Sequence, residues 1–408
     1  MKKLIAIMLI LLLALGAGAC SSGNQETETP ADSDNSGSEQ VENQAEHTIA
    51  VLVYDRTDEE VLSFKDYLEN YIAGAFDVKF LYSESISSQE DAMKFLENAA
   101  DYGAEGVMSF NSYDLKKEVE FCKDKGMYFM MASGTVTDEA FKSVEDNEYF
   151  LGTVGPGDEM EYMAGVNLAN AGLSFTDKKE SVFILSGGSA IGNEMHRLRT
   201  VGLLEKYENA YGVQFSKKPE EIAASEDIFE EESKDLKICV CPGYLSVPEL
   251  LERAKEKYES GDYNVVLGVL PVTRLLSEIK GAKLGIVDCY SQTNQSLFST
   301  GELNFVTGKY SSIIGPSFAA MYNAITGHAD EFRDNGKAFR IKQGFWSSDS
   351  REDFDEKYSI ASSIEKCAYN YEDLQKVIKK YTPDATLDDL TRLAEAYTYE
   401  DAVARRAV

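Results

Sequence analysis

The stretch SVFILSGGSAIGNEMHRLRTVGLLE, residues 181–205, decides the fold of this chain. Residues 181–185 carry the clustered apolar side chains of a buried strand. Gly187, Gly188 and Gly192 then open a loop that can pass close to a ligand, and a helical pattern follows. Small molecules bind beyond the carboxyl ends of strands in open α/β sheets. The stretch therefore predicts a binding loop that leads into the first turn of a helix.

Two arginines, Arg197 and Arg199, lie just past the first turn of this predicted helix. A guanidinium offers five fixed donors for hydroxyls or a carboxylate, so an arginine here can hold a polar ligand. A surface arginine paired with Glu194 or Glu205 is an equally open interpretation. For the neighbouring His196, a position on the helix surface is favoured over a contact with the ligand.

Segments with the pattern of buried strands alternate with helical segments on both sides of this stretch. The predicted strands are residues 48–54, 78–83, 106–110, 127–133, 149–154, 181–187, 237–242, 264–270 and 283–290. Helices between consecutive strands imply right-handed crossovers and a parallel sheet covered on both faces. Because the alternation restarts after residue 154, we expect an α/β protein with two doubly wound parallel-sheet lobes.

Later segments return the chain to the first lobe. A strand at 305–310 followed by a helical pattern predicts this return, and the segment 339–346 is expected to cross back again. The two lobes are therefore expected to be joined by a hinge of three crossovers, near Val154, Lys309 and Gln343.

The first 46 residues have the composition of a secretory leader and a linker. Lys2 and Lys3 precede an apolar run, residues 4–15, that is too short to span a membrane comfortably, and small residues lead to Cys20. Residues 21–46 contain almost no large apolar side chains and are rich in Ser, Gly, Asn, Gln, Thr and acids. This composition predicts a disordered tether that follows a cleaved signal.

The charge of the chain excludes one class of partner. Seventy acidic and 40 basic side chains give a formal charge of −30, which argues against binding to the phosphates of nucleic acid. It says little about a small ligand, because a binding site can differ locally from the whole surface. With 408 residues, 43% of them hydrophobic, the chain is long enough to build two cores.

The cysteines do not indicate a metal site. Five of them follow Cys20 and cannot all pair internally: Cys122, Cys239, Cys241, Cys289 and Cys367. Two are separated by a single residue on a predicted strand, but no second pair or histidine cluster lies nearby, so the case for zinc is weak. We expect most of them to be small buried hydrophobic residues.

Motifs for catalysis are incomplete. Gly308 and Lys309 lack the upstream glycine and the following hydroxyl residue of a phosphate-binding P-loop. The run GGSAI at 187–191 breaks the Gly-x-Ser-x-Gly pattern of a hydrolase nucleophile at its last position. With three histidines in the chain, nothing in the sequence places one beside a nucleophile. We therefore predict a protein that is not an enzyme and that uses no cofactor.

From Thr48 to Trp346 the chain resembles the type I periplasmic binding proteins, the ribose and galactose receptor class that shares its fold with lac-repressor-type sensor domains. The resemblance lies in the organisation and in four segments: GAEGVMSFNSYD at 103–114, HRLRTVG at 196–202, KLGIVDCY at 283–290 and VTGKYSSIIG at 306–315. It implies ligand contacts by one residue or pair in each segment, namely Asn111 with Asp114, Arg197, Asp288 and Lys309.

The N-terminal run ALGAGAC, residues 14–20, resembles the lipobox of bacterial lipoproteins. Ala17 stands where those sequences usually carry leucine. The resemblance implies that Cys20 becomes the lipid-modified first residue of the mature chain. Acyl chains on Cys20 would hold the protein at a membrane face, outside the cytoplasm, without a spanning helix.

The first strand–helix loop departs from the sugar receptors of this class. They usually carry aromatic residues there to stack on the sugar, whereas this loop is charged from Asp55 to Glu60 and has no aromatic beyond Tyr54. Arg56 with Asp55 and Asp58 could form a polar claw for hydroxyls or an amine, although an exposed loop of charges is the commoner case. A plain hexose is therefore disfavoured. The sole tryptophan, Trp346, is expected to fill a core corner rather than stack on a ligand.

We expect five parts in the chain. They are a signal peptide (1–20), a tether (21–46), a first lobe (47–154 with 309–335), a second lobe (155–308 with 336–360) and a helical C-terminal extension (361–408). The extension carries two amphipathic patterns, 371–383 and 387–406, separated by Pro383. We expect them to pack on a lobe, and contact with a partner or a second copy is the alternative.

These features together predict an extracytoplasmic solute-binding lipoprotein. It would close on a small polar ligand such as a sugar or a sugar derivative and deliver it to the permease of an ABC transporter. Two alternatives stay open: a receptor that presents its closed form to a membrane signalling protein, and a surface interaction lipoprotein with a degenerate cleft.

Overall fold

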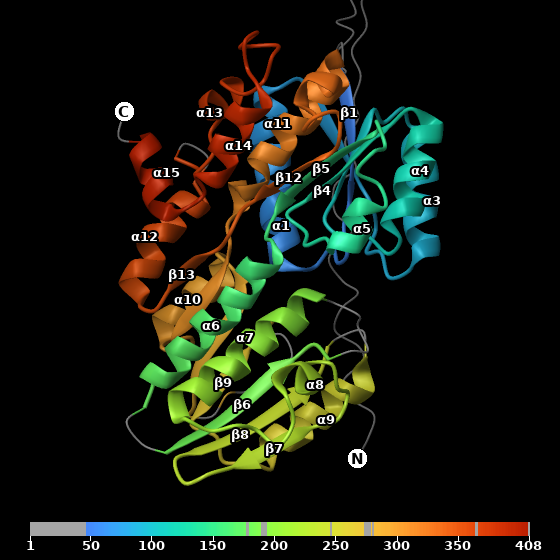
Figure 1. The fold of residues 1–408 in the computed structure, drawn as a ribbon. Coiled ribbons are helices and arrows are strands. Elements are labelled where there is room, and N and C mark those ends of the chain that lie inside the picture. The colour runs from blue at the N-terminus through green and yellow to red at the C-terminus, as the bar shows by residue number, and fades with distance from the viewer. Residues whose placement is uncertain are drawn as a thin grey trace, which may run out of the picture. The chain divides into compact units, whose positions relative to one another are not determined.

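Two sheets organise the computed structural model, which describes residues 46–176, 179–188, 194–244, 247–272, 279, 281–363 and 366–406 (Figure 1). The predicted signal peptide, Cys20 and all but the last residue of the tether lie outside the described residues, as does part of the glycine loop at 189–193. Among the described residues, no helix is both long enough and apolar enough to cross a membrane.

The first sheet consists of parallel strands in the order β12-β5-β4-β3-β1-β2. Its strands are β1 (His47–Leu52), β2 (Val78–Tyr82), β3 (Gly106–Ser109), β4 (Tyr128–Ala132), β5 (Phe150–Gly155) and β12 (Phe339–Lys342). Strands β1, β3 and β5 are buried along their whole length because helices cover both faces of the sheet.

The second sheet has the order β13-β11-β10-β9-β6-β8-β7, and only its two edge strands, β7 and β13, are antiparallel to their neighbours. Its strands are β6 (Glu180–Ser186), β7 (Phe229–Glu232), β8 (Leu236–Pro242), β9 (Val265–Gly268), β10 (Lys283–Cys289), β11 (Phe305–Lys309) and β13 (Trp346–Ser348). The two mostly parallel sheets confirm the predicted α/β fold class.

Helices connect the strands. In chain order they are α1 (Glu59–Asp66), η1 (Tyr67–Ile72), α2 (Ala73–Ala75), α3 (Gln89–Asp101), α4 (Leu115–Lys125), α5 (Asp138–Lys142), α6 (Asp158–Ser174), α7 (Glu194–Tyr211), α8 (Pro219–Ala223), α9 (Pro248–Glu259), α10 (Gln292–Thr300), η4 (Ser311–Ile314), α11 (Gly315–Asn323), η5 (Ala324–His328), η6 (Ala329–Phe332), α12 (Arg351–Ala361), α13 (Tyr371–Gln375), α14 (Leu387–Glu395) and α15 (Tyr399–Arg406). Polar N-cap side chains such as Ser88, Ser291 and Thr386 accept backbone amide hydrogen bonds and fix where many of these helices begin.

The chain passes between the sheets after β5, after β11 and after β12. The third passage corrects one predicted boundary. The sequence placed residues 336–360 in the second lobe, whereas β12 pairs with β5 in the first sheet and the chain crosses only at residues 343–345. β12 is an edge strand of four residues that buries only Phe339 and Ile341. An apolar pattern this short does not indicate in the sequence which sheet the strand joins.

The C-terminal extension packs on α11 and β12 of the first lobe. It forms three helices, not the two that the sequence predicted, because the second predicted pattern, 387–406, is divided into α14 and α15. The first pattern, 371–383, yields only α13, which ends at Gln375. The carbonyls of Gln375 and Val377 accept hydrogen bonds from the side chains of Thr382 (2.9 Å) and Asn323 (2.8 Å). Carbonyls that a longer helix would use are thus taken by side-chain donors.

Two predictions for single residue types are confirmed within the described part. All five cysteines there are free and buried, and the Sγ atoms of Cys239 and Cys241 lie 3.6 Å apart on one face of β8. Trp346 is buried and its ring stacks on Tyr310, with ring centroids 3.9 Å apart. Trp346 therefore belongs to the core.

Candidate functional site

Loops at the carboxyl ends of the two sheets contact each other. The loop after β1 leads into α1, whose Glu60 accepts an ion-paired hydrogen bond from Lys309 at the end of β11, with Nζ and Oε1 3.0 Å apart. The neighbouring Glu59 accepts a hydrogen bond from the hydroxyl of Thr293 in α10. The predicted binding region thus has polar groups from both sheets in direct contact.

Lys309 is buried, with 6% of its surface exposed, although it is a strand-end lysine. Lysine carries a strongly hydrated charge, so burial requires a partner, and Glu60 supplies it. Lys309 therefore links the lobes here and is not a freely solvated cation.

Asp288 is the second-last residue of β10, and its Oδ2 accepts a hydrogen bond of 2.8 Å from the amide nitrogen of Asn294. Desolvation raises the pKa of Asp288 to about 7, with a further upward contribution from the negative charges of Asp58 and Glu59. The bond from Asn294 opposes this rise. Near neutral pH the carboxyl can therefore donate as well as accept a hydrogen bond.

The acidic side chains of the first loop shape its backbone. Asp58 is buried and caps α1, accepting from the amide of Glu60 (2.9 Å) and the hydroxyl of Tyr54 (3.2 Å). Asp55 accepts from the amide and the hydroxyl of Thr57, both at 2.8 Å. These bonds form an Asx-type turn that presents the start of α1.

Arg56 is paired with an acid outside this loop. It is exposed and donates to Glu84, which follows β2, at 2.6 Å. Among the residues that the structure describes, the ion pair of Arg56 is therefore with Glu84 and not with the two aspartates of the predicted claw.

The segment after β3 places its two predicted residues differently. Asp114 is exposed and caps α4 by accepting from the amide of Lys117 at 3.1 Å. Asn111 is half-buried at the end of the strand, and its carbonyl accepts from the hydroxyl of Ser109. The buried acid of this segment is Glu118, which the sequence did not indicate. It accepts from Ser112 (2.6 Å), and desolvation raises its pKa.

Arg197 is paired within its own helix. Its Nε and Nη2 donate to the two carboxylate oxygens of Glu194 at 2.9 and 2.5 Å, which is the surface pairing that the sequence left open. The more buried arginine is Arg199, at 5% exposure. Its Nε donates to Glu161 in α6 (2.6 Å) and its Nη1 to the carbonyl of Val269 (3.0 Å).

The ion pair of Arg199 and Glu161 also connects the lobes. The second carboxylate oxygen of Glu161 accepts from the hydroxyl of Thr135, which follows β4, at 2.7 Å. The guanidinium of Arg199 lies over the ring of Phe345 in the third crossover, 5.6 Å from its centroid. Glu161 escaped the sequence interpretation because it lies 38 residues from its partner.

His196 is buried, which contradicts the helix-surface position that the sequence favoured. Burial, with a contribution from the positive charge of Arg199, lowers its pKa to about 3, so the imidazole is neutral at physiological pH. The positions 196, 200, 203 and 207 follow helical spacing and are all buried. That spacing was the signal in the sequence that His196 lies on the buried face of α7. It was missed because histidine is a polar residue.

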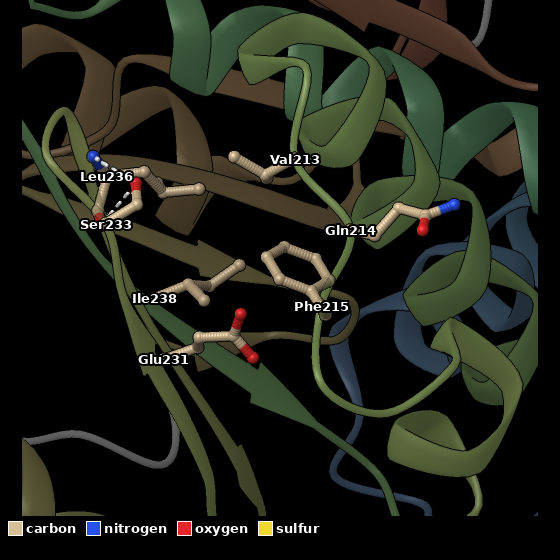
Figure 2. A pocket seen from close by; sticks show the side chains of 7 residues that line it. All are labelled: Val213, Gln214, Phe215, Glu231, Ser233, Leu236 and Ile238. Atoms are coloured by element: carbon tan, nitrogen blue, oxygen red, sulfur yellow. Dashed lines mark hydrogen bonds between the residues drawn. The ribbon is translucent and has the colours of Figure 1, made fainter.

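A cavity of about 240 Å³ lies elsewhere, between the end of α7 and the amino-terminal part of β8. Figure 2 shows Phe215 and Ile238 facing each other there. Its other lining residues are Val213, Gln214, Glu231, Ser233 and Leu236. The carboxylate of Glu231 accepts from the amide of Ser216 at 2.8 Å. None of the predicted ligand-binding residues lines this cavity.

Among the described residues, no group of three or more His, Cys, Asp or Glu is arranged to hold a metal ion.

Comparison with known proteins shows the fold. No protein-family model matches the sequence, and no curated protein sequence gives a significant match. Among solved structures, an ABC transporter solute-binding protein from Bacillus halodurans C-125 with bound myo-inositol is 13% identical, with a TM-score of 0.54, covering 78% of this chain and 98% of that chain. A periplasmic solute-binding protein from Actinobacillus succinogenes 130z with bound D-allose is 12% identical, with a TM-score of 0.55, covering 76% and 99%.

A carbohydrate transporter from Acidothermus cellulolyticus 11B in complex with myo-inositol is 14% identical, with a TM-score of 0.53, covering 78% of this chain and 98% of that chain. These likenesses confirm that the chain has the two-lobe fold of the type I periplasmic binding proteins.

Proposed function

We propose that this chain is an extracytoplasmic solute-binding lipoprotein that closes its two lobes on a small polar ligand of sugar or polyol type and hands it to an ABC transporter permease. The observation that carries the proposal is the fold itself: two parallel-sheet lobes joined by three crossovers, with polar loops at their strand ends in contact. Solved proteins of the same fold carry myo-inositol or D-allose. A hinge of this kind lets a ligand select a closed state by its differential affinity.

The predicted ligand residues take distinct parts in this proposal. Asp288, Asn111 and Lys309 stand at strand ends and hold polar edges of the solute. Arg197 contributes only if the solute draws it from Glu194. Asp55, Arg56, Asp58 and Asp114 act by shaping the loops, through the turn and helix-cap bonds that they make.

Thermal unfolding of the purified full chain against sugars, polyols, sugar acids, nucleosides and amino acids tests the proposal. A ligand at 100 times its dissociation constant stabilises the folded state by about 2.7 kcal/mol, which raises the unfolding midpoint. Asp288→Asn should weaken binding of the same ligand. Asp124→Asn, an exposed position in α4, is the control and should leave it unchanged. A ligand that binds yet leaves the radius of gyration in solution scattering unchanged would speak against closure.

The lipid anchor has its own test. Cells that express the full chain and grow on labelled palmitate should label this protein, and the membrane fraction should retain it. Cys20→Ser should abolish the label and release the protein from the membrane fraction. Cys122→Ser, at a buried position in α4, is the control and should keep both. An unlabelled wild-type chain would reject the anchor without affecting the binding proposal.

A further inference from the structure

Three buried polar side chains at strand ends have no hydrogen-bond partner within the part of the chain that the structure describes. They are the hydroxyls of Ser133 and Ser186 and the Nδ1 atom of His196. These residues are exposed by only 4%, 1% and 4%, respectively. Nearly all buried polar groups in folded proteins are hydrogen-bonded, and an unpaired one is costly. A bound ligand that supplies the missing hydrogen bonds would account for such groups.

All three stand where a ligand would lie. Ser133 follows β4, Ser186 ends β6, and His196 is in the first turn of α7, the helix that follows β6. These are carboxyl ends of parallel strands, the edge at which open α/β sheets bind small molecules. The ring of His196 lies 5.8 Å from that of Tyr244, which follows β8 at the same edge.

Contacts of Arg199 and Glu161 connect two of these positions, His196 and Ser133, across the lobes. His196 is one helical turn before Arg199, and the charge of Arg199 contributes to its lowered pKa. Arg199 binds Glu161, and Glu161 accepts from Thr135, two residues after Ser133. The buried charges of this chain of contacts cancel one another. The groups without a partner at Ser133, Ser186 and His196 are uncharged donors and acceptors.

The backbone at Ser133 adds a second sign of constraint. Its φ of 65° lies in the left-handed region, which is unfavourable for a residue other than glycine. The amide of Ser133 donates to the carbonyl of Val154 (2.7 Å), and a Cβ at Gly155 would come within 3.0 Å of the Ser133 carbonyl carbon. The neighbouring strand β5 therefore fixes the backbone of Ser133 in place.

We propose that Ser133, Ser186 and His196 bind the solute directly, and that they receive uncharged hydroxyl groups of a polyol or sugar rather than a carboxylate, phosphate or amine. This inference rests on the proposed function and assigns ligand contacts within that same site. A hydroxyl donates and accepts at once, which suits a neutral imidazole and two seryl hydroxyls. An anion or a cation would find no opposite charge among these three groups.

The test compares Ser186→Ala and His196→Leu with the wild type in the full chain. Without ligand, both variants should unfold at the same temperature as the wild type or higher, because they remove a group that has no internal partner. Binding of myo-inositol or D-allose should weaken at least tenfold. Ser83→Ala is the matched control, since Ser83 is an equally buried serine after β2 whose hydroxyl accepts from the amide of Val53 (3.0 Å). It should lower the unfolding midpoint and leave the affinity unchanged.

Each outcome decides the inference. Destabilisation of unliganded Ser186→Ala and His196→Leu comparable to that of Ser83→Ala overturns it, because the groups would then have structural partners. A charged solute that binds the wild type and both variants equally overturns it and leaves the proposed function intact. Absence of binding to every solute overturns both.

A separate observation concerns the hinge. The carbonyl of Tyr397 in the C-terminal extension accepts from the hydroxyl of Tyr310 (2.9 Å) and from the indole nitrogen of Trp346 (2.7 Å). Tyr310 follows β11 and Trp346 begins β13, so the two donors belong to different crossovers. The side-chain amide of Gln343, after β12, donates to the carbonyl of Ala394 in α14 (3.3 Å).

The packing around these bonds is tight. A Cβ at Gly344, in the third crossover, would come within 2.5 Å of the Tyr397 hydroxyl. The rings of Tyr310 and Trp346 stack at 3.9 Å. The extension thus fastens two of the three segments that must twist when the lobes open and close. We infer that residues 366–406 restrain the hinge and limit how far the unliganded lobes open.

Distances between labels on the two lobes test this restraint. Lys94→Cys in α3 and Glu256→Cys in α9 provide exposed attachment sites in a Cys20→Ser chain whose other cysteines are buried. Tyr310→Phe, alone and with Trp346→Phe, should broaden the distribution of single-molecule transfer efficiencies without ligand. Tyr113→Phe removes a tyrosine bond to a carbonyl (Ile86, 2.8 Å) within the first lobe and should leave the distribution unchanged. An unchanged distribution in Tyr310→Phe overturns the inference.

Discussion

The carboxyl of Asp288 links the candidate site to the pH dependence of stability. Its pKa is about 7 in the folded chain, against about 3.9 for an aspartate in an unfolded chain. Between these two values the folded state binds more protons at this group than the unfolded state does. The free energy of unfolding that depends on Asp288 therefore decreases as pH rises from about 4 to about 7, and the loss is complete above that range.

Replacing the carboxyl of Asp288 should remove this loss of stability at high pH. Asp288→Asn should be more stable than the wild type at pH 8, by up to about 4 kcal/mol at about 1.4 kcal/mol per pKa unit, with the difference vanishing near pH 4. Urea unfolding of both chains at pH 4.5, 6 and 8 measures the effect, with the exposed Asp124→Asn as control. A stability difference that is the same at all three pH values would contradict the raised pKa.

The residues around the arginine pair show what the sequence could and could not predict about the site. The sequence placed Arg197 and Arg199 just past the first turn of a helix, and both lie near the start of α7. It could not tell which of them would be buried, because the partner of Arg199 is Glu161 on another helix. Ser133 and Ser186 left no signal, since an isolated serine after a strand has many structural roles. Hydrogen bonds between segments that are distant in the sequence can be identified only once the fold is known.

The pair of Glu161 and Arg199 leads to a prediction at the same scale. Glu161 is fully buried, so Glu161→Gln leaves the guanidinium of Arg199 without its counter-charge, at a cost of roughly 3–5 kcal/mol of stability. Arg199→Met should lower the stability by a similar amount, because it leaves the carboxylate of Glu161 buried without its counter-charge. The double variant should lose less than the sum of the two, because no buried charge is left alone. Chemical denaturation of the four chains gives the coupling energy, and strict additivity would contradict an ion pair in this place.

At the scale of elements, two glycines set the contact of α6 with α7. A Cβ at Gly165 would lie 1.9 Å from the carbonyl oxygen of Arg199, and one at Gly202 would lie 2.2 Å from that of Tyr162. Both obstacles are backbone atoms, which cannot rotate away. The two helices can therefore approach this closely only because each has a glycine opposite the backbone of the other.

Gly165→Ala and Gly202→Ala should each force these helices apart, with a loss of about 1–3 kcal/mol or more from overpacking. Gly74→Ala in α2 is the control: a Cβ there meets no atom within 4 Å, so alanine should gain up to about 1 kcal/mol of helix propensity. The midpoints of denaturant unfolding compare the three variants. A neutral Gly165→Ala would show that the helices lie farther apart than these distances indicate.

Elements with a strong apolar pattern were predictable, and those without one were not. β1, β6 and β10 have long apolar runs and lie where the sequence predicted strands. β7, with the sequence FEEE, was missed because three acids in a row show no alternation. It pairs as an antiparallel edge next to β8, where charged residues discourage pairing with another chain. An edge strand of this kind forms because it pairs with its neighbouring strand, and its own residues give little sign of it.

At the scale of the whole molecule, alternation of strands and helices was enough to predict two doubly wound lobes. The alternation could not show how the C-terminal extension would join them. Its amphipathic patterns indicated a packed face without naming the surface that it covers. In the structure that surface is α11 and β12, and the extension supplies the buried Leu374, Ile378 and Leu390 to the core. The extension is thus part of the folded unit and not an appendage.

A chain that ends at residue 361 should therefore lose its cooperative fold. Burial of a large aliphatic side chain contributes about 1.5–3 kcal/mol, so the removal of three consumes much of a stability of roughly 5–15 kcal/mol. Leu390→Ala provides a milder version, with an expected loss of about 2–5 kcal/mol. Leu62→Ala, at a leucine that is 47% exposed, is the control and should lose far less. Far-ultraviolet circular dichroism and Trp346 fluorescence report the transition independently. A truncated chain that melts like the full one would show that the two lobes are stable without the extension, and its contacts would then serve only the hinge.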